Sequence, residues 1–194
     1  MYERNNVIRQ FERTIAKYCG APYAVAVESC SAALFLCCLY LTVKEVTIPS
    51  KTYFSVPFGI RNAGGKVKFK NIKWRGAYQL KPYPIVDSAM RFKKGMYKPG
   101  EFQCLSFQYS KHIPIGRGGM ILTDDKKALR WFQVMRNDGR REIAKEKDRV
   151  KLNGWNLYMT PEQAARGLSL FYWRIFGRED QPDMEMTHGD ISYV

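Results

Sequence analysis

The sequence predicts an α/β protein: a three-layer sandwich in which helices cover a mostly parallel β-sheet. Short apolar runs recur along the chain, and longer stretches with helical character separate them. This alternation favours parallel strands, because a parallel pair needs a crossover connection that is usually a helix. In such sheets, ligand-binding residues gather where the strands end at the carboxyl edge.

The size and charge of the chain set broad limits on its function. Its 194 residues suffice for one well-buried core, or for a core with a small appendage. With 45% hydrophobic and 14% aromatic residues, the composition is that of a globular protein. The net charge of +14 permits binding of nucleic acid, of an anionic surface or of a phosphorylated small molecule, and selects none of them.

The cysteines and the apolar runs predict a cytoplasmic protein without a membrane span. The five cysteines show no CxxC spacing and lie mostly in apolar stretches, so we expect reduced thiols in a core. The two histidines are too far apart to form a zinc site with them. The first residues are charged where a secretory signal is apolar, and the longest apolar run, 32–43, is shorter than the roughly 20 residues that span a bilayer.

The N-terminal part of the chain is predicted to contain a helix, a strand and a second helix. Apolar residues recur every three or four positions within residues 2–18 and predict an amphipathic helix, which Gly20 would end. The run YAVAVES (23–29) predicts a strand. The stretch CSAALFLCCLYL (30–41), apolar on nearly every side, predicts a buried helix directly after it.

Several strands and two more helices are predicted further along the chain. The last helix has clear start signals, because Thr160 can cap it, Pro161 suits its first turn and Gln163 completes a capping box. Polar, acidic residues without periodicity follow, so we expect one domain over residues 1–176 and an extended tail over 177–194. The other predicted strands are 45–50, 66–72, 83–89, 104–107 and 118–124, and the helices are 126–135 and the stretch from 160 onward.

Polar residues stand at the ends of three predicted strands. Ser29 and Ser31 flank a helix start whose free N–H groups can bind a phosphate, although either serine could simply cap the helix. Asp87 ends an apolar strand, where it needs a cation or hydrogen-bond donors, or caps the next turn. Lys111 could lose its proton in a partly desolvated pocket and attack a carbonyl, or be an ordinary surface lysine. None of these residues assigns a function alone.

The segment from 106 to 119 has a specific pattern, S-F-x-x-x-K-x-x-x-x-G-x-G-G. Other segments with a characteristic order are FERTIAKYCGAPYAVAVESCSAAL, EVTIPSKTYFSVPFGIRNAGGKVKF, PIVDSAM, MRNDGR and GWNLYMTPEQAARG. Over most of residues 10–170, the chain resembles the DegT/DnrJ/EryC1/StrS family of pyridoxal-phosphate-dependent sugar aminotransferases. The resemblance implies the large domain of the aspartate-aminotransferase fold, fold type I, here without the C-terminal small domain.

The resemblance implies a role for each matching residue. Lys111 would hold pyridoxal 5'-phosphate as an internal aldimine, a Schiff base, and then carry the proton between substrate carbon and cofactor. Asp87 would pair with the pyridinium nitrogen and keep it protonated, so that the ring accepts electrons. Tyr53 would stack on the face of the ring. The phosphate would be bound by Cys30 and Ser31, with help from Ser106.

The resemblance also implies the reaction and the partners. A keto group on a nucleotide-linked sugar would receive the amino group of an amino acid, with glutamate as the expected donor. Asn156 lies in the segment GWNLYM, through which family members reach into the neighbouring subunit's site, so a homodimer with shared active sites is implied. The basic chain would suit a diphosphate substrate.

The sequence departs from the family pattern in two further places. Only residues 73–83 join the predicted strands 66–72 and 83–89, where relatives have an additional helix-strand-helix unit, and we expect the two flanking strands to pair directly. Met90 replaces the Gln or His that contacts the ring hydroxyl of the cofactor, so we expect that hydrogen bond to be lost.

Two alternative functions remain open at this point. One is a cofactor-binding homologue without turnover. The other is a basic nucleic-acid-binding protein. This alternative is less favoured, because the chain has no recognition-helix or RNP-type motif.

Overall fold

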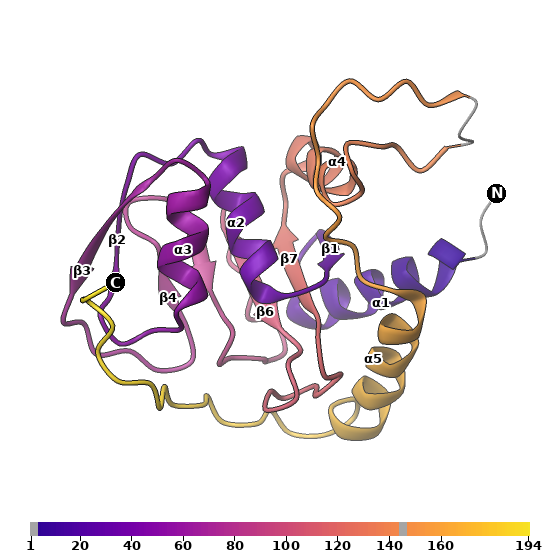
Figure 1. Cartoon of the computed structure of the whole chain (residues 1–194). Coiled ribbons are helices and arrows are strands. Elements are labelled where there is room, and N and C mark those ends of the chain that lie inside the picture. The colour runs from indigo at the N-terminus through magenta and orange to yellow at the C-terminus, as the bar shows by residue number, and fades with distance from the viewer. Residues whose placement is uncertain (1–3, 144–146) are drawn as a thin grey trace.

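In a computed structural model of the chain, residues 4–143 and 147–194 are described, and they form a layered α/β structure (Figure 1). The predicted first helix therefore begins outside the described residues, which include it from Arg4 onward. In chain order the elements are α1 (Arg4–Cys19), β1 (Tyr23–Val27), α2 (Cys30–Tyr40), β2 (Glu45–Pro49), α3 (Ser55–Asn62), β3 (Lys66–Lys70), β4 (Tyr78–Gln79), β5 (Ile85–Asp87), β6 (Phe102–Ser106), β7 (Gly119–Thr123), α4 (Lys126–Met135) and α5 (Pro161–Arg174).

The described strands form a mixed sheet and a smaller parallel one. The five-stranded sheet has the order β1-β7-β6-β5-β4, and β2 pairs with β3 apart from it. Among the described neighbours in the large sheet, β5 and β6 run parallel and the other pairs run antiparallel. This differs from the mostly parallel sheet that the sequence predicts. The reason is that β4 returns to β5 through residues 80–84, and β6 to β7 through residues 107–118, and neither connection contains a crossover helix.

The segment that joins β3 to β5 contributes a short strand of its own. β4 pairs antiparallel with β5, so β5 has a neighbour on each side. β3 pairs with β2 and not with β5, so the expected direct pairing of the flanking strands is wrong. Instead, the chain after β4 reaches β2 through an antiparallel bridge, in which Thr47 and Lys81 exchange N–H···O bonds of 2.8 and 3.2 Å. This bridge attaches the small sheet to the large one.

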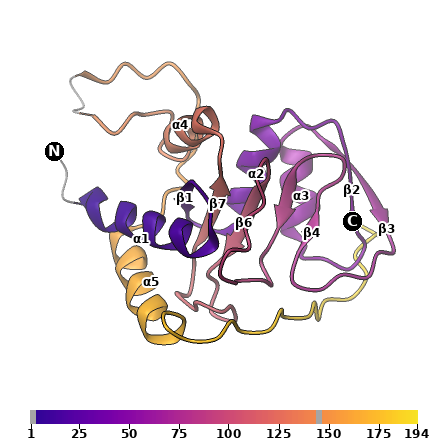
Figure 2. The same cartoon turned by 180° about the vertical axis from the view of Figure 1, so that it is seen from behind.

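Helices cover both faces of the five-stranded sheet, which confirms the predicted α/β sandwich (Figures 1 and 2). On one face, α2 packs on β5, β6 and β7 and contacts α3 and α4; on the other, α1 packs on α5 and on β1. Successive side chains of β1 point to opposite faces of the sheet, as in any strand. Val25 and Val27 lie in the hydrophobic cluster on the α2 side, and Ala24 and Ala26 lie in the cluster on the α1 side.

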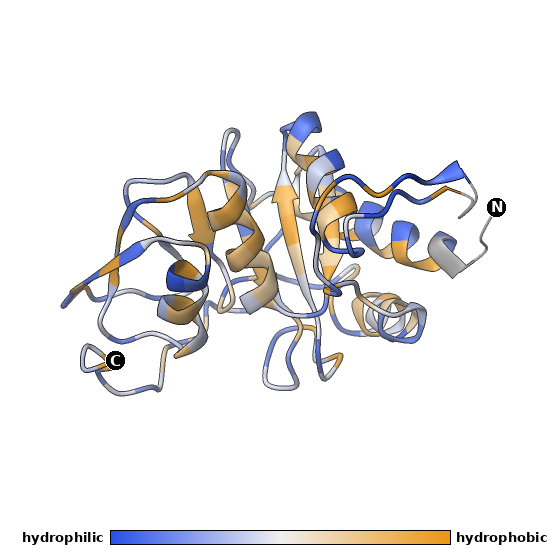
Figure 3. Cartoon of the chain, turned by 45° about the horizontal axis from the view of Figure 1, so that its top comes forward, coloured by the Kyte–Doolittle hydropathy of each residue, from blue (hydrophilic) through white to orange (hydrophobic). Residues whose placement is uncertain are grey.

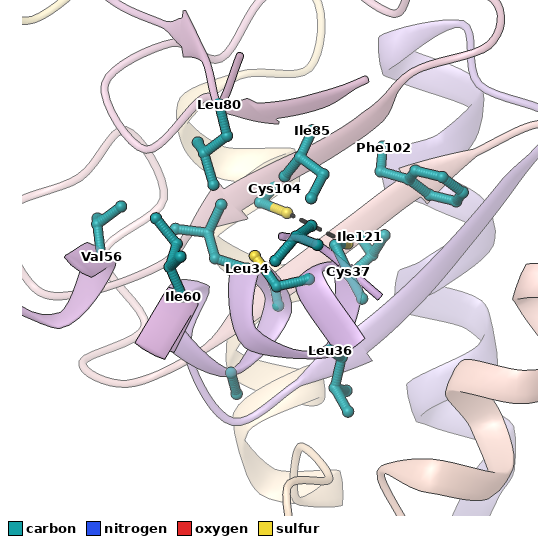
Figure 4. Close-up of a cluster of buried hydrophobic side chains, with 14 of the residues drawn as sticks. Leu34, Leu36, Cys37, Val56, Ile60, Leu80, Ile85, Phe102, Cys104 and Ile121 are labelled. Carbon is teal, nitrogen blue, oxygen red and sulfur yellow. Dashed lines mark hydrogen bonds between the residues drawn. The ribbon is translucent and has the colours of Figure 1, made fainter. Parts of the chain in front are cut away.

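The apolar residues of the sequence fill these two layers. Figure 3 shows the hydrophobic colour gathered in α2 and the central strands, and all residues of β7 are buried. Figure 4 shows the cluster beneath α2, in which the thiols of Cys37 and Cys104 lie 3.7 Å apart. No helix within 4–143 or 147–194 has both the length and the apolar character needed to cross a bilayer.

A buried ion pair joins α1 to the end of α4. Arg136 Nη1 lies 2.6 Å from Glu12 Oε1, and the two side chains are 5% and 7% exposed. The same Glu12 oxygen accepts the backbone N–H of Ala26 in β1 at 2.8 Å, and the guanidinium also donates to the Ala26 carbonyl and to Glu142. The charge pair therefore joins the end of α4 to α1 and β1, which lie more than 100 residues earlier in the chain.

The last helix starts as the sequence predicts. Thr160 Oγ1 accepts the N–H of Gln163 at 3.3 Å, and Gln163 Oε1 accepts the N–H of Thr160 at 2.8 Å, which completes the capping box. Residues 177–194 contain no helix or strand and follow one edge of the molecule towards β3 (Figure 1).

Candidate active site

A cavity of about 520 Å³ lies beside the carboxyl ends of β1, β5 and β6. Its size is within the range of roughly 300–1,000 Å³ that is usual for small-molecule sites. Among the residues that line it are Cys30, Ser31, Tyr53, Asp87, Ser106 and Lys111. The structure thus brings six of the seven site residues predicted from the sequence to one place.

Asp87 is a buried acid at the end of β5. Its residue is 4% exposed, and its Oδ1 accepts the N–H of Ala89 at 3.0 Å. Burial raises the pKa of this carboxyl group, while hydrogen bonds from the Ala89 N–H and the Tyr78 hydroxyl and the charge of Lys111 act in the opposite direction. A carboxylate in this position gains from a cationic or N–H partner that enters the cavity.

Lys111 stands in the loop between β6 and β7 with its amine in the cavity wall. Its Nζ donates to the sulfur of Met90 at 3.1 Å, and no ion pair joins it to an acid in the described ranges 4–143 and 147–194. Burial lowers the pKa of Lys111, although the nearby Asp87 and Cys30 act to raise it. A lowered pKa increases the share of neutral amine, which is the nucleophilic form.

The N-terminus of α2 forms one end of the cavity. Ser29 Oγ accepts the N–H of Ala32 at 3.1 Å, so Ser29 is the N-cap. Ser31 Oγ lies 2.5 Å from Ser55 Oγ, at the start of α3. Sequence reasoning missed Ser55, because it did not predict α3, a helix of only eight residues. Hydroxyl groups and free N–H groups at a helix N-terminus provide donors for an anion.

The glycine-rich segment allows β7 to approach this helix start closely. A Cβ placed on Gly119 would lie 2.2 Å from the carbonyl carbon of Ser29 and 2.5 Å from the nitrogen of Cys30. Any larger residue would therefore push the N-terminus of α2 away from β7. The glycine at this position of the sequence pattern keeps the helix start in place over the strand.

Residues of the C-terminal segment complete the wall of the cavity. Met186, Thr187 and His188 line it together with Tyr53, whose ring centre lies 5.3 Å from that of His188. Sequence reasoning missed all three, since they stand in a polar stretch without periodicity. The available signal was that His188 is one of two histidines in the chain.

Asn156 is the predicted site residue that the structure does not bring to the cavity. It is not among the lining residues. Its Nδ2 donates to Asp138 Oδ2 at 3.4 Å, and its backbone forms an antiparallel bridge with Asn137. Within a single chain, Asn156 therefore does not contact a ligand in this cavity.

The model of the DegT/DnrJ/EryC1/StrS aminotransferase family matches residues 2–87 and 93–172. The chain belongs to this family. No curated protein matches it. Among solved structures, it is similar to AtS13 from Actinomadura melliaura, with a TM-score of 0.72 and 19% identity, and to PseC from Helicobacter pylori, with a TM-score of 0.73 and 17% identity.

A third similar structure is DesI in the presence of its TDP-sugar product, with a TM-score of 0.70 and 19% identity. At identities of 19%, 17% and 19%, the similarity shows that this chain shares the fold of these three structures. The comparisons with AtS13, PseC and DesI cover 87%, 88% and 86% of this chain. They cover 60%, 58% and 53% of those structures, so the chain spans less than two thirds of their length.

Proposed function

We propose that the cavity binds pyridoxal 5'-phosphate and that the chain transfers an amino group from an amino acid, glutamate, to a keto group of a nucleotide-linked sugar. The observation that carries this proposal is the placement of Asp87 and Lys111 on one cavity. An acid buried at the end of a strand and an amine with a lowered pKa both face a helix N-terminus rich in hydroxyl groups.

The cavity residues fit the chemical groups of this cofactor. When bound, pyridoxal phosphate supplies an aldehyde and a ring that accepts the electron pair released at the substrate carbon. Asp87 would hold a proton on the ring nitrogen. Lys111 would bind the aldehyde carbon and move the proton at the substrate carbon. The phosphate would lie at Cys30 and Ser31.

The remaining cavity residues would position the cofactor. Tyr53 would pack against the ring, and Ser106 would donate to the phosphate. Met90 Sδ contacts the Lys111 amine at 3.1 Å; because a thioether has no N–H to donate, we keep the expectation that the hydrogen bond to the ring hydroxyl is lost.

The substrate class is inferred from structures that share this fold. PseC is described as an aminotransferase involved in the biosynthesis of pseudoaminic acid, and the DesI structure as one in the presence of its TDP-sugar product. We extend the nucleotide-sugar class to this chain. The proposal includes a homodimer in which Asn156 contributes to the partner's site, and a cytoplasmic location.

The proposal is tested by trapping the cofactor with borohydride. The chain is incubated with pyridoxal phosphate, reduced, digested and analysed by mass spectrometry. We expect a phosphopyridoxyl group on Lys111 in preference to exposed lysines such as Lys98, because burial lowers the pKa of Lys111 and increases its share of neutral amine. Modification spread over exposed lysines with Lys111 unmodified would contradict the proposal.

The variant Asp87→Asn tests the role of the buried acid. Asp87→Asn keeps the shape of the side chain and removes its charge, so we expect the half-reaction with glutamate to slow by at least about 100-fold while the adduct on Lys111 still forms. The measurement is the absorbance change of the cofactor in a single turnover. Asp124→Asn removes the same charge at an exposed position and is expected to react at the wild-type rate.

The same measurement separates turnover from binding alone. A wild-type chain that forms the adduct, but whose cofactor stays unchanged with glutamate and other amino donors, would be a cofactor-binding homologue without turnover. Equal rates in Asp87→Asn and the wild type would show that the buried acid does not act on the cofactor.

A further inference from the structure

The C-terminal segment 180–191, which we call the strap, is fixed to the body of the protein before it reaches the cavity. Asp180 accepts the hydroxyl of Tyr18 at 2.6 Å. Asp183 accepts hydrogen bonds from two nitrogens of Arg91, and the shorter of these contacts is 2.6 Å. The Asp183 side chain is only 13% exposed. In Figure 1, the strap is the yellow segment that runs from α5 towards β3.

Backbone hydrogen bonds connect the strap to the cavity itself. The N–H of Gly76 donates to the Met184 carbonyl at 3.2 Å, and the N–H of Met184 donates to the Met90 carbonyl at 2.9 Å. Met90 is the residue whose sulfur contacts the amine of Lys111. A Cβ on Gly76 would lie 2.5 Å from the carboxyl carbon of Asp183, so this glycine leaves the room that the strap occupies.

A second attachment follows in the chain after the strap residues that line the cavity. Ile191 is 2% exposed, and its N–H donates to the carbonyl of Ser50 at 2.9 Å. Residues 186–188, which line the cavity, therefore lie between two anchored points. Anchoring on both sides reduces the conformational entropy that this wall would lose when a ligand binds.

His188 is the basic residue of the strap that faces the cavity. Its ring lies against the rings of Tyr53 and Phe54, with centre distances of 5.3 and 6.3 Å. Its nitrogens make no hydrogen bond or ion pair within the described residues, 4–143 and 147–194. By contrast, the Arg117 guanidinium in the same wall lies 2.6 Å from Glu28, and Lys111 is assigned to the cofactor.

We propose that His188 binds an anionic oxygen of the substrate, on a carboxylate or a phosphate group, and that the strap is part of the substrate-binding wall. The inference rests on the proposed function for the nature of the ligand. An imidazole N–H that donates to a charged oxygen forms one of the stronger hydrogen bonds in proteins. The amino donor would offer a carboxylate, and the nucleotide-linked sugar a diphosphate.

The test uses the histidine ring signals of the full chain in the presence of pyridoxal phosphate. Because the chain has two histidines, the ring signals in a nuclear magnetic resonance spectrum form two sets, and His188→Ala identifies one of them. The probes are glutarate, which carries two carboxylates, and thymidine diphosphate. At constant pH we expect one of the probes to shift the His188 signals in the wild type.

The affinity for that probe provides the second readout. Loss of one charge-assisted hydrogen bond in His188→Ala is expected to raise the dissociation constant about tenfold. The control Tyr193→Ala removes another ring two residues beyond the strap, at a residue that is 78% exposed, and is expected to bind like the wild type. A shift with glutarate would assign His188 to the amino donor, and a shift with thymidine diphosphate would assign it to the nucleotide.

Unshifted His188 signals with both probes would overturn the inference, and so would an unchanged dissociation constant in a folded His188→Ala chain. These outcomes are distinct from failure of the proposed function. If borohydride traps no adduct on Lys111 while the His188 signals still shift, the strap binds an anion in a site with another chemistry.

Discussion

Lys111→Arg is expected to abolish the borohydride-trapped adduct and to slow the proposed amino transfer by at least about 1,000-fold. Arginine keeps the positive charge near Asp87, but its guanidinium does not deprotonate in proteins. It can therefore neither bind an aldehyde carbon nor move a proton at the substrate carbon. Mass spectrometry of the reduced protein and single-turnover absorbance with glutamate measure the two losses.

Two companion variants separate chemistry from folding. Lys98→Arg makes the same substitution at an exposed lysine and is expected to react like the wild type. Lys111→Ala leaves space for a small amine, so added methylamine should restore part of the amino transfer if the lost group is the amine itself. An adduct that persists in Lys111→Arg would assign cofactor binding to another lysine.

Arg136→Met is expected to lower the free energy of unfolding by about 3–5 kcal/mol, the usual cost of removing one partner from a buried ion pair. The substitution leaves the Glu12 carboxylate, 7% exposed, with the Ala26 N–H as its remaining close donor in the described residues. It also removes a link between α1, β1 and α4. Urea unfolding followed by circular dichroism measures the change.

The matching control is an exposed pair. Lys68 and Glu45 lie 2.9 Å apart with side chains 61% and 55% exposed, so Lys68→Met should change the stability by less than about 1 kcal/mol. The double variant Arg136→Met with Glu12→Leu should recover much of the lost stability, because an apolar pair removes the unpaired charge. A cost below 1 kcal/mol for Arg136→Met alone would show that water still reaches Glu12.

The site was more predictable from the sequence than the direction of the strands. Asp87 and Ser106 end buried strands, and ends at the same edge of a sheet bring their residues together. An apolar run does not indicate, however, whether the strand runs parallel or antiparallel to its neighbours. β7 is buried at every position, which is typical of a parallel strand, although it runs antiparallel to both of its neighbours.

The strap could not be predicted because its contacts are distant in sequence. A polar, acidic stretch indicates exposure to solvent when only neighbouring residues are considered. Asp183 lies instead against Arg91, and that pairing has no local pattern that would reveal it. The short strand β4 was missed for a similar reason, since two residues are too few to show alternation.

The pairing of β1 with β7 has a consequence for how the protein is made. Tyr23 lies opposite Thr123, so β1 is synthesised about 100 residues before β7, its pairing partner among the described strands. α2 begins directly after β1 and rests against Gly119. The end of the cavity at the N-terminus of α2 is therefore assembled only after Lys111 and Gly119 have been synthesised.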